Sequence, residues 1–385
     1  MSEPPYKLIV VGAGAGGLAC ALAAADADVS VLLLEKSARL GGTITQSLLH
    51  TIGGLYDDAG EYLNPGLPVE LEQRLLRSCS RAGKRKMGRV WVLNVAPTAY
   101  EDVIESWVAD KPAITVLRQA TITRLEATAK RITRVEVTRD KSVIPLTVGA
   151  VVDATGAAEI TRMLDEKKVL LGNALAGLIF QIRGVEKDAL KFPKNVVTRR
   201  AVQAAVEQDA LPDIFNGAWF DTGVWEDEAY IKLNLSPQTY TPRLAMTWQA
   251  AIADLLPQLP GFTGAHITRR GELGIRDGGR IRGEYNLTLA DIKNNPPVSE
   301  SAGRCAWPIE YWHPQTGVTL DYLPAGHTYT IPLPALRVAG MDNLWAVGKC
   351  LSAEPLAQAS ARVAGACWAM GEAVGRVLSQ RSNMS

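Results

Sequence analysis

The sequence predicts an α/β protein in which a Rossmann-like nucleotide-binding domain is combined with a mixed α+β domain. A glycine-rich turn directly follows the first apolar run of the chain, and a second glycine pair comes shortly after the next apolar run. Near the C-terminus, an apolar run again ends in glycine. With 385 residues, the chain is too long for one ordinary core and suits two domains.

The composition is that of an ordinary globular protein, with 47% hydrophobic residues, 21% charged residues and a formal net charge of +1. Such a balance creates no broad positive field, so we expect neither a nucleic-acid partner nor attraction to an anionic membrane. Five cysteines stand far apart without a C-x-x-C pair, which argues against a disulfide scaffold, a redox-active dithiol and a zinc or other metal site. The first strand begins too early for a signal peptide, and no apolar run approaches the ~20 residues of a membrane span. We therefore expect a cytoplasmic protein.

Each glycine of the first turn has a predicted physical role. The turn follows the apolar run Leu8–Val11, and the next apolar run ends on Glu35. Gly12 allows the tight turn, Gly14 lets the backbone approach a pyrophosphate, and Gly17 lets the following helix pack closely on the strand. That helix directs free N–H groups and the positive end of its dipole at phosphates. Because Glu35 is placed to accept hydrogen bonds from an adenosine ribose, the unit predicts dinucleotide binding.

The segment after the second glycine pair, Gly41-Gly42, alternates between helix and strand patterns. Residues 98–109 have apolar side chains at helical spacing and predict a helix, and residues 114–117 predict a strand. Alternating stretches predict an antiparallel meander over residues 121–126, 132–138 and 143–148. A further apolar strand then ends in Ala154-Thr155-Gly156.

Residues 166 to about 335 contain no second G-x-G-x-x-G motif, and they predict a mixed domain. Its expected elements are strands over residues 178–183 and 230–235 and a helix over residues 243–256. The nucleotide-fold pattern returns from Asp342, with a strand over residues 342–349 that ends in glycine at Gly348. One helix is predicted from about residue 357 to residue 378.

Taken together, these motifs resemble the FAD-dependent oxidoreductases of the FAD_oxidored type, which have a glutathione-reductase-like FAD fold. The motifs that carry the resemblance span nearly the whole chain in the expected order. They are G-A-G-A-G-G at residues 12–17, L-G-G-T at 40–43, V-D-A-T-G at 152–156, L-G-I-R at 273–276, R-I-R-G-E-Y at 280–285, Y-T-I-P at 329–332 and D-N-L at 342–344. Lys349 stands where the family commonly has arginine, and the loop before the last helix lacks the histidine that relatives often carry.

The resemblance implies FAD as the cofactor and a division of the chain into two parts. Residues 1–165 and 336–385 would form the FAD-binding domain, residues 166–335 the substrate domain, and parts of residues 45–100 would reach the substrate side. Ile122 would contact the adenine, and Arg362-Val363 would face the pyrimidine edge of the flavin at the start of the last helix. The full set of expected cofactor-binding residues is Gly12, Gly14, Ala15, Gly16, Gly17, Glu35, Lys36, Gly41, Gly42, Thr43, Ile122, Ala154, Thr155, Gly156, Gly348, Lys349, Arg362 and Val363.

Seven polar side chains outside the nucleotide motifs are candidates for orienting a substrate or moving a proton. They are His50, Arg276, Arg280, Tyr285, His313, His327 and Tyr329. Arg276 and Arg280 stand four residues apart, so in a helix they would share a face and hold an anionic group. The alternative is that they form structural ion pairs with Glu272 or Asp277.

Three functions are compatible with this pattern. The first is an FAD-dependent dehydrogenase or oxidase that acts on a small organic or peptide-linked substrate. The second is a flavin monooxygenase that uses NAD(P)H and oxygen, although its Asp-Gly motif is replaced here by Asp153-Ala154-Thr155-Gly156. The third is a non-catalytic escort protein that keeps the fold without FAD, which the intact glycine set and Glu35 oppose.

Overall fold

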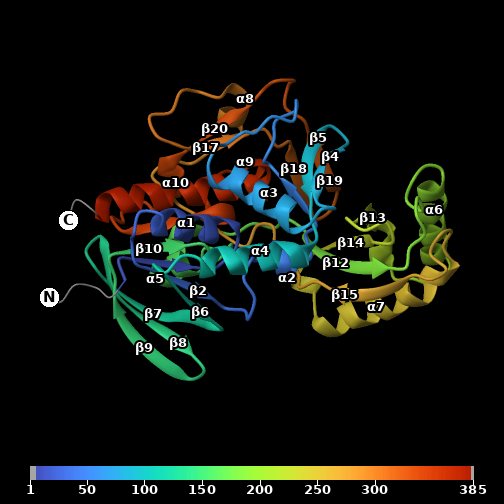
Figure 1. The fold of residues 1–385 in the computed structure, drawn as a ribbon, viewed down its shortest axis with the longest axis horizontal. Helices are drawn as coiled ribbons and strands as arrows, with labels where there is room; N and C mark the ends of the chain where they lie inside the picture. Colours follow the sequence, from blue (N-terminus) through green and yellow to red (C-terminus); the bar gives the residue numbers. More distant parts are fainter. Residues whose placement is uncertain (1–5, 383–385) are drawn as a thin grey trace.

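The computed structural model describes residues 6–382 and shows a large body with a smaller lobe at one end (Figure 1). The body is built on a five-stranded parallel sheet in the order β21-β10-β1-β2-β6. Its strands are β1 (Leu8–Val11), β2 (Val31–Glu35), β6 (Ile114–Arg118), β10 (Ala150–Asp153) and β21 (Leu344–Ala346). The strands predicted from apolar runs at residues 8–11, 114–117 and before Ala154 are confirmed.

The two faces of this sheet are covered differently. Alternate residues of β1 and β2 pack against helices on one face and against an antiparallel sheet on the other. The helices are α1 (Ala15–Ala25), α3 (Leu67–Ser78), α4 (Pro97–Ala109) and α10 (Ala364–Ser382). The antiparallel strands, which lie below the body in Figure 1, are β7 (Ala120–Thr128), β8 (Arg131–Arg139) and β9 (Ser142–Thr147). The carboxyl ends of the parallel strands remain available between these layers, where nucleotide folds bind their ligands.

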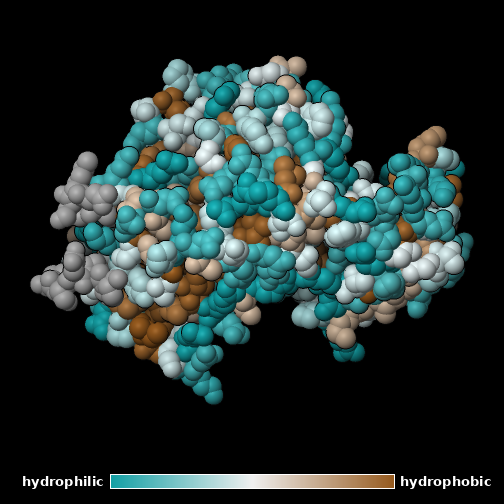
Figure 2. Space-filling view, in the orientation of Figure 1, coloured by the Kyte–Doolittle hydropathy of each residue, from teal (hydrophilic) through white to brown (hydrophobic). Residues whose placement is uncertain are grey.

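The lobe is a four-stranded antiparallel sheet in the order β13-β14-β12-β15, backed by two helices. Its elements are β12 (Ala176–Arg183), α6 (Lys194–Glu207), β13 (Trp219–Thr222), β14 (Ala229–Leu235), α7 (Pro242–Leu255) and β15 (His266–Arg270). The predicted strands over residues 178–183 and 230–235 and the helix over residues 243–256 are therefore confirmed. Figure 2 shows that hydrophilic side chains cover most of the visible face of both parts.

Shorter elements complete the structure. They are α2 (Thr43–Gln46), β3 (Thr51–Gly53), β4 (Gly83–Met87), β5 (Val90–Asn94), α5 (Glu159–Leu164), β11 (Val169–Leu170), β16 (Arg280–Ile281), α8 (Leu289–Asn294), β17 (Ser301–Cys305), β18 (Ile309–His313), β19 (Gly317–Asp321), β20 (Tyr329–Pro332) and α9 (Pro355–Ala361). Single 3₁₀ turns occur at Glu166–Lys168, Asp213–Gly217, Pro237–Thr239, Leu256–Gln258, Leu333–Leu336 and Gly348–Cys350. The lobe sheet contacts the segment after α2, where Leu48 packs with Ile179 and Tyr230.

The predicted C-terminal helix needs correction. The sequence indicates one helix over residues 357–378, but the structure contains two helices, α9 and α10, separated at Arg362-Val363. Arg362 leaves the helical conformation and donates from Nη2 to the carbonyl oxygen of Glu310 in β18, at 3.1 Å. Val363 packs so closely on Gly54 that a side chain at position 54 would collide with it. These long-range contacts break a segment whose local sequence is helical throughout.

Candidate cofactor and substrate site

At two positions of the first turn, contacts within the protein itself require a glycine. Gly12 has a φ of +105°, and a β-carbon there would lie 2.4 Å from the carbonyl oxygen of Ala154. A β-carbon at Gly17 would lie 1.9 Å from the carbonyl oxygen of Gly12. These contacts bring the β1–α1 turn against the end of β10, so the first glycine motif and Ala154-Thr155-Gly156 form one site.

Gly14 is different, because nothing in the protein requires a glycine there. Its backbone is extended, with φ −80°, and a β-carbon would meet no atom closer than the Cα of Gly42 at 4.0 Å. Gly14 is also the N-cap of α1 and has no side-chain capping bond, so the first N–H groups of α1 keep their capacity for an anion. A glycine at this position therefore keeps the space in front of α1 open to an external ligand.

The carboxylate of Glu35 is buried beside this turn. It accepts hydrogen bonds from the N–H of Ala13 at 2.8 Å and from the N–H of Ser37 at 2.9 Å. The next residue, Lys36, forms an exposed ion pair with Glu159 at 3.5 Å. Glu35 is therefore fixed at the end of β2, with lone pairs left for a further donor.

The second glycine pair forms the opposite wall of the turn. The N–H of Gly41 donates to the carbonyl oxygen of Ala13 at 2.8 Å, and a β-carbon at Gly42 would lie 2.8 Å from the Cα of Gly14. Thr43 then begins α2, which leads the chain away toward the lobe. The backbone of this pair thus lies directly beside the start of α1 and borders the space in front of it.

The third and fourth segments of the site come from β10 and β21. A β-carbon at Gly16 would lie 3.1 Å from the backbone nitrogen of Gly348, so the helix and the end of β21 are in contact. Gly156, with φ +77°, leaves room for the half-buried side chain of Lys349. The ammonium of Lys349 donates to the carbonyl oxygen of Ile275 at 2.7 Å, and burial lowers its pKa. Ile122 is buried in β7.

Because the C-terminal helix is broken, α10 begins at Ala364, directly after Arg362-Val363. A helix start there offers N–H groups without partners within the helix and the positive end of its dipole. A β-carbon at Gly365 would lie 2.4 Å from the backbone of Gly54, so this start is held against the segment that follows β3.

The sheet of the lobe has one apolar and one polar face. The apolar residues of β14 within Ile231–Leu235 are buried with residues of α6 and α7. Tyr230, Lys232 and Asn234 alternate with them and therefore point to the other face. That polar face is turned toward the body, where Tyr230 stacks on His50 with ring centroids 3.7 Å apart.

His50 is fully buried and has one free nitrogen. Its Nε2 lies 3.1 Å from Oδ2 of Asp221, and its Nδ1 has no hydrogen-bond partner in the protein. Arg85 binds the same Asp221 carboxylate through both oxygens, at 2.8 Å each. Burial and the nearby Lys232 lower the pKa of His50 to about 3, so the imidazole is neutral at physiological pH. The Asp221 carboxylate then holds the proton on Nε2, which leaves Nδ1 as an unused acceptor.

Arg276 lies against the same polar face of the lobe sheet, beside Asn234. Its guanidinium donates to the carbonyl oxygen of Leu175 at 2.5 Å and to Oδ1 of Asn234 at 2.7 Å. It also lies over the ring of Trp312, with Cζ 4.3 Å from the centroid. Glu310 is nearby, and its carboxylate accepts from two tryptophan indoles.

With this arrangement in view, comparison with known proteins identifies the family. The model of the "FAD dependent oxidoreductase" family matches residues 7–383. The chain belongs to the FAD dependent oxidoreductase family. Its cofactor is accordingly FAD, and it is a flavin-dependent enzyme. The sequence has no significant match among curated proteins.

Solved structures show the same fold at low sequence identity. One is a geranylgeranyl bacteriochlorophyll reductase-like protein from Thermoplasma acidophilum, which is 12% identical to this chain. The match covers 98% of this chain and 78% of that protein, with a TM-score of 0.53. Another is a triple mutant of the flavin-dependent brominase Bmp2, which is also 12% identical. That match covers 99% of this chain and 81% of the brominase, with a TM-score of 0.51. These likenesses concern the fold of the FAD dependent oxidoreductases and do not extend to their substrates.

The residues of this chain fit FAD. The space in front of α1, called the FAD slot below, is bordered by the backbones of Gly14 and Gly42, which lie side by side, as a pyrophosphate site requires. Glu35 lies at the end of β2 beside that slot. The start of α10 lies on the other side of Gly348 and supplies a positive helix end. The predicted FAD-binding residues around Gly14, Glu35, Gly42, Thr155, Gly348 and Val363 are thus brought together from six separate segments.

The other five catalytic candidates lie in different surroundings. Arg280 is buried and pairs with Asp277 at 3.1 Å, and residues 273–279 are not helical, so Arg276 and Arg280 do not share a helix face. Tyr329 is buried and its hydroxyl is 2.8 Å from Oγ of Ser360. Tyr285 is exposed. The imidazole of His313 accepts from N–H groups of its own hairpin.

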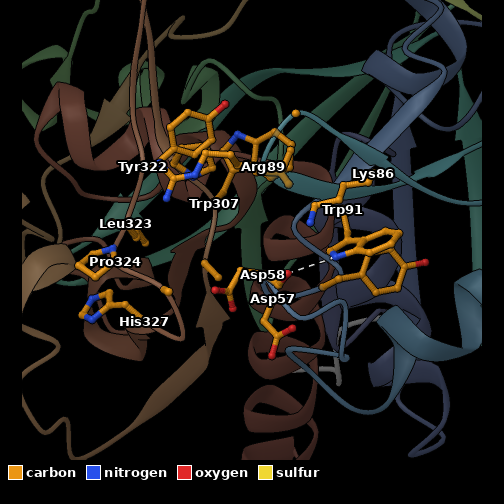
Figure 3. Close-up of a pocket in the computed structure, with 16 residues that line it drawn as sticks. Asp57, Asp58, Lys86, Arg89, Trp91, Trp307, Tyr322, Leu323, Pro324 and His327 are labelled. Atoms are coloured by element: carbon orange, nitrogen blue, oxygen red, sulfur yellow. Dashed lines mark hydrogen bonds between the residues drawn. The ribbon is translucent and has the colours of Figure 1, made fainter.

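His327 lines a pocket of about 250 Å³ on the surface of the body (Figure 3). The pocket combines aromatic walls with charges of both signs. The cation of Arg89 lies over the ring of Tyr322 on one side, and the carboxylate of Asp58 is on the other. Trp307 forms part of its wall, and the indole N–H of Trp307 donates to Oε2 of Glu310 at 3.0 Å. Trp307 therefore connects this pocket, through Glu310, to the group around Arg276.

Several polar residues of this region escaped the sequence analysis. They are Arg85, Asp221, Lys232, Asn234, Glu310 and Trp312. The strict alternation of polar and apolar residues in β14 is the signal that would have found Lys232 and Asn234. The other four carry no local signal, because only the packing of β4, β13 and β18 brings them to the site.

Proposed function

We propose that this FAD-dependent enzyme is a dehydrogenase or oxidase that removes electrons from a small organic or peptide-linked substrate. The observation that carries the proposal is His50, a buried neutral imidazole whose Nδ1 has no partner. It lies between the segment after the second glycine pair and the polar face of the lobe sheet. A buried acceptor left unpaired is costly, so a substrate donor that completes it is the simplest explanation.

In this proposal the FAD slot is lined by Gly12, Gly14, Gly42 and Gly348, and Glu35 holds the ribose. Bound FAD supplies two-electron chemistry, which no side chain of the protein can provide. Through Nδ1, His50 accepts a hydrogen bond from an O–H or N–H group of the substrate and orients that group for oxidation. The Asp221 carboxylate, 3.1 Å from Nε2, keeps the proton on that nitrogen and holds the ring in this orientation.

We further propose the domain division and subtype that the resemblance implies. Residues 1–165 and 336–385 would form a glutathione-reductase-type FAD domain, with β7, β8 and β9 as its meander. Residues 166–335 would form the substrate side, which combines the lobe with strands β17 to β20. The pocket beside Trp307 supports this proposal, because its aromatic walls and its charges of both signs suit an incoming polar substrate.

The purified protein should be yellow, with flavin absorbance near ~450 nm. We expect anaerobic NADH and NADPH to leave this absorbance unchanged, and a suitable substrate to bleach it. A His50→Gln variant should keep its FAD and lose at least about 100-fold of the substrate-dependent bleaching rate. Rapid bleaching by NAD(P)H that depends on added substrate would instead establish the monooxygenase alternative. A colourless protein that takes up no added FAD would refute both functions.

A further inference from the structure

Arg276 is a half-buried cation that has only neutral partners. Its contacts are the carbonyl oxygen of Leu175, the amide oxygen of Asn234 and the face of the Trp312 ring. Within residues 6–382 no carboxylate lies within ion-pair distance of its guanidinium. Two of its five N–H donors are therefore used, and three remain.

The neighbouring charges do not balance this cation. Arg85, Lys232, Arg276 and Arg362 are four cations, and they share the carboxylates of Asp221 and Glu310, which leaves two positive charges in excess. The third carboxylate near Arg362, that of Asp277, is already paired with Arg280. The ammonium of Lys232 is 3.6 Å from Asp221, but Arg85 already binds that carboxylate through both oxygens.

Glu310 does not neutralise Arg276 either. Its Oε1 accepts from the indole of Trp312 at 2.7 Å, and its Oε2 accepts from the indole of Trp307 at 3.0 Å. Arg362 reaches only the backbone carbonyl oxygen of Glu310. Burial lowers the pKa of Arg276, Arg362 and Lys232, which is the expected cost of holding cations without matching anions.

The chain makes space for the Arg276 guanidinium and fixes its orientation. A β-carbon at Gly177 would lie only 3.3 Å from Nη2 of Arg276, so the small residue in β12 leaves room for the guanidinium. Asn234 holds the guanidinium from the next strand, and Trp312 supports its flat side. A planar guanidinium fixed in this way is suited to a bidentate contact with a carboxylate.

We propose that Arg276 binds the carboxylate of an acidic organic substrate, with Lys232 as the second cation. The proposal rests on the proposed function, because it names the substrate class for the same site. Lys349 lies against Gly156 in the FAD slot, and Arg362 directly precedes α10. Arg276 instead belongs to the lobe sheet through Asn234, which assigns it to the substrate and not to the cofactor.

The test compares carboxylates with neutral molecules of the same shape. Acetate and benzoate are titrated into the flavin-loaded protein by calorimetry, beside acetamide and benzamide. We expect the carboxylates to bind at least about 10-fold more tightly than the amides, because only they carry the charge that the site lacks. Arg276→Ala should weaken benzoate binding by about 10- to 100-fold, and Arg276→Lys should restore part of the loss.

The matched control is Arg183→Ala. Arg183 lies at the other end of β12 and pairs with Asp227 at 2.8 Å, so its loss should leave benzoate binding unchanged. Equal binding of amides and carboxylates, unchanged affinity in Arg276→Ala, or tighter binding of inorganic phosphate would each overturn the proposal. If Arg276→Ala does not fold, benzoate is titrated into Arg276→Lys instead, which should bind it more weakly than the unchanged protein does. A colourless protein that still binds benzoate through Arg276 would refute the proposed flavin chemistry alone.

Discussion

The substitution Gly14→Ala distinguishes an effect on FAD binding from an effect on the stability of the fold. Position 14 has φ −80°, which alanine adopts freely, and the nearest protein atom to an added β-carbon is 4.0 Å away. The methyl group therefore enters the space in front of α1 and displaces nothing in the protein. If that space receives the FAD pyrophosphate, the substitution should affect cofactor binding almost alone.

The magnitudes follow from the local structure. Alanine is a poorer N-cap than glycine, but it also restricts the unfolded chain, so we expect the unfolding free energy of the FAD-free protein to change by less than about 1 kcal/mol. The melting temperature should then shift by no more than about 2–4 °C. Losing even one N–H contact to a charged phosphate costs about 1.5–3 kcal/mol, which weakens FAD binding by about 10- to 150-fold.

Gly17→Ala is the matched comparison. A β-carbon at position 17 would lie 1.9 Å from the carbonyl oxygen of Gly12, so the backbone must move and the fold itself should lose about 3 kcal/mol or more. Both variants are stripped of FAD, melted by calorimetry and titrated with FAD by absorbance. We expect Gly14→Ala to lose FAD and keep its melting temperature, and Gly17→Ala to lose both. Full FAD affinity in Gly14→Ala, or equal melting of the two variants, would refute the argument.

Two further predictions concern stability. The folded protein lowers the pKa of His50 from 6.5 to about 3, so the unfolded chain takes up this proton first as the pH falls. The stabilisation is complete above about pH 6.5 and is lost below it, by about 2 kcal/mol on reaching pH 5. Urea unfolding of His50→Gln should lack this part of the pH dependence, and an unchanged slope would contradict it. Arg280→Met leaves Asp277 buried without its partner and should cost about 3–5 kcal/mol in urea unfolding, whereas Arg183→Ala, on a half-exposed pair, should cost less than about 1 kcal/mol. Equal costs for the two arginine variants would show that burial of the pair is not what matters.

The sequence predicted the nucleotide half of the molecule well because its signals are local. Gly12 and Gly17 are needed by turns and contacts that recur wherever a strand passes directly into a helix. Apolar runs and helical spacing likewise predicted α4, α7 and the strands of the parallel sheet. Family membership and FAD follow from the same motifs, and the match over residues 7–383 confirms them.

The substrate side was less accessible to sequence reasoning. His50 and Arg276 were chosen by residue type, but their partners Asp221 and Asn234 lie 171 and 42 residues away in the chain. The pairing of Arg280 with Asp277 was foreseen as an alternative, because those residues are neighbours in sequence. The break between α9 and α10 was not foreseen, since it depends on contacts with Glu310 and Gly54.

By itself the sequence determined that this protein holds FAD, because a pyrophosphate slot is made of backbone and its glycines stand at fixed spacing. Only the tertiary structure decided which polar groups meet between the lobe and the body. The polar side of β14, the free nitrogen of His50 and the unbalanced cation at Arg276 come from segments far apart in the chain, which meet only where the lobe packs on the body. Charge balance is a property of neighbours in space, and the order of residues along the chain does not contain it.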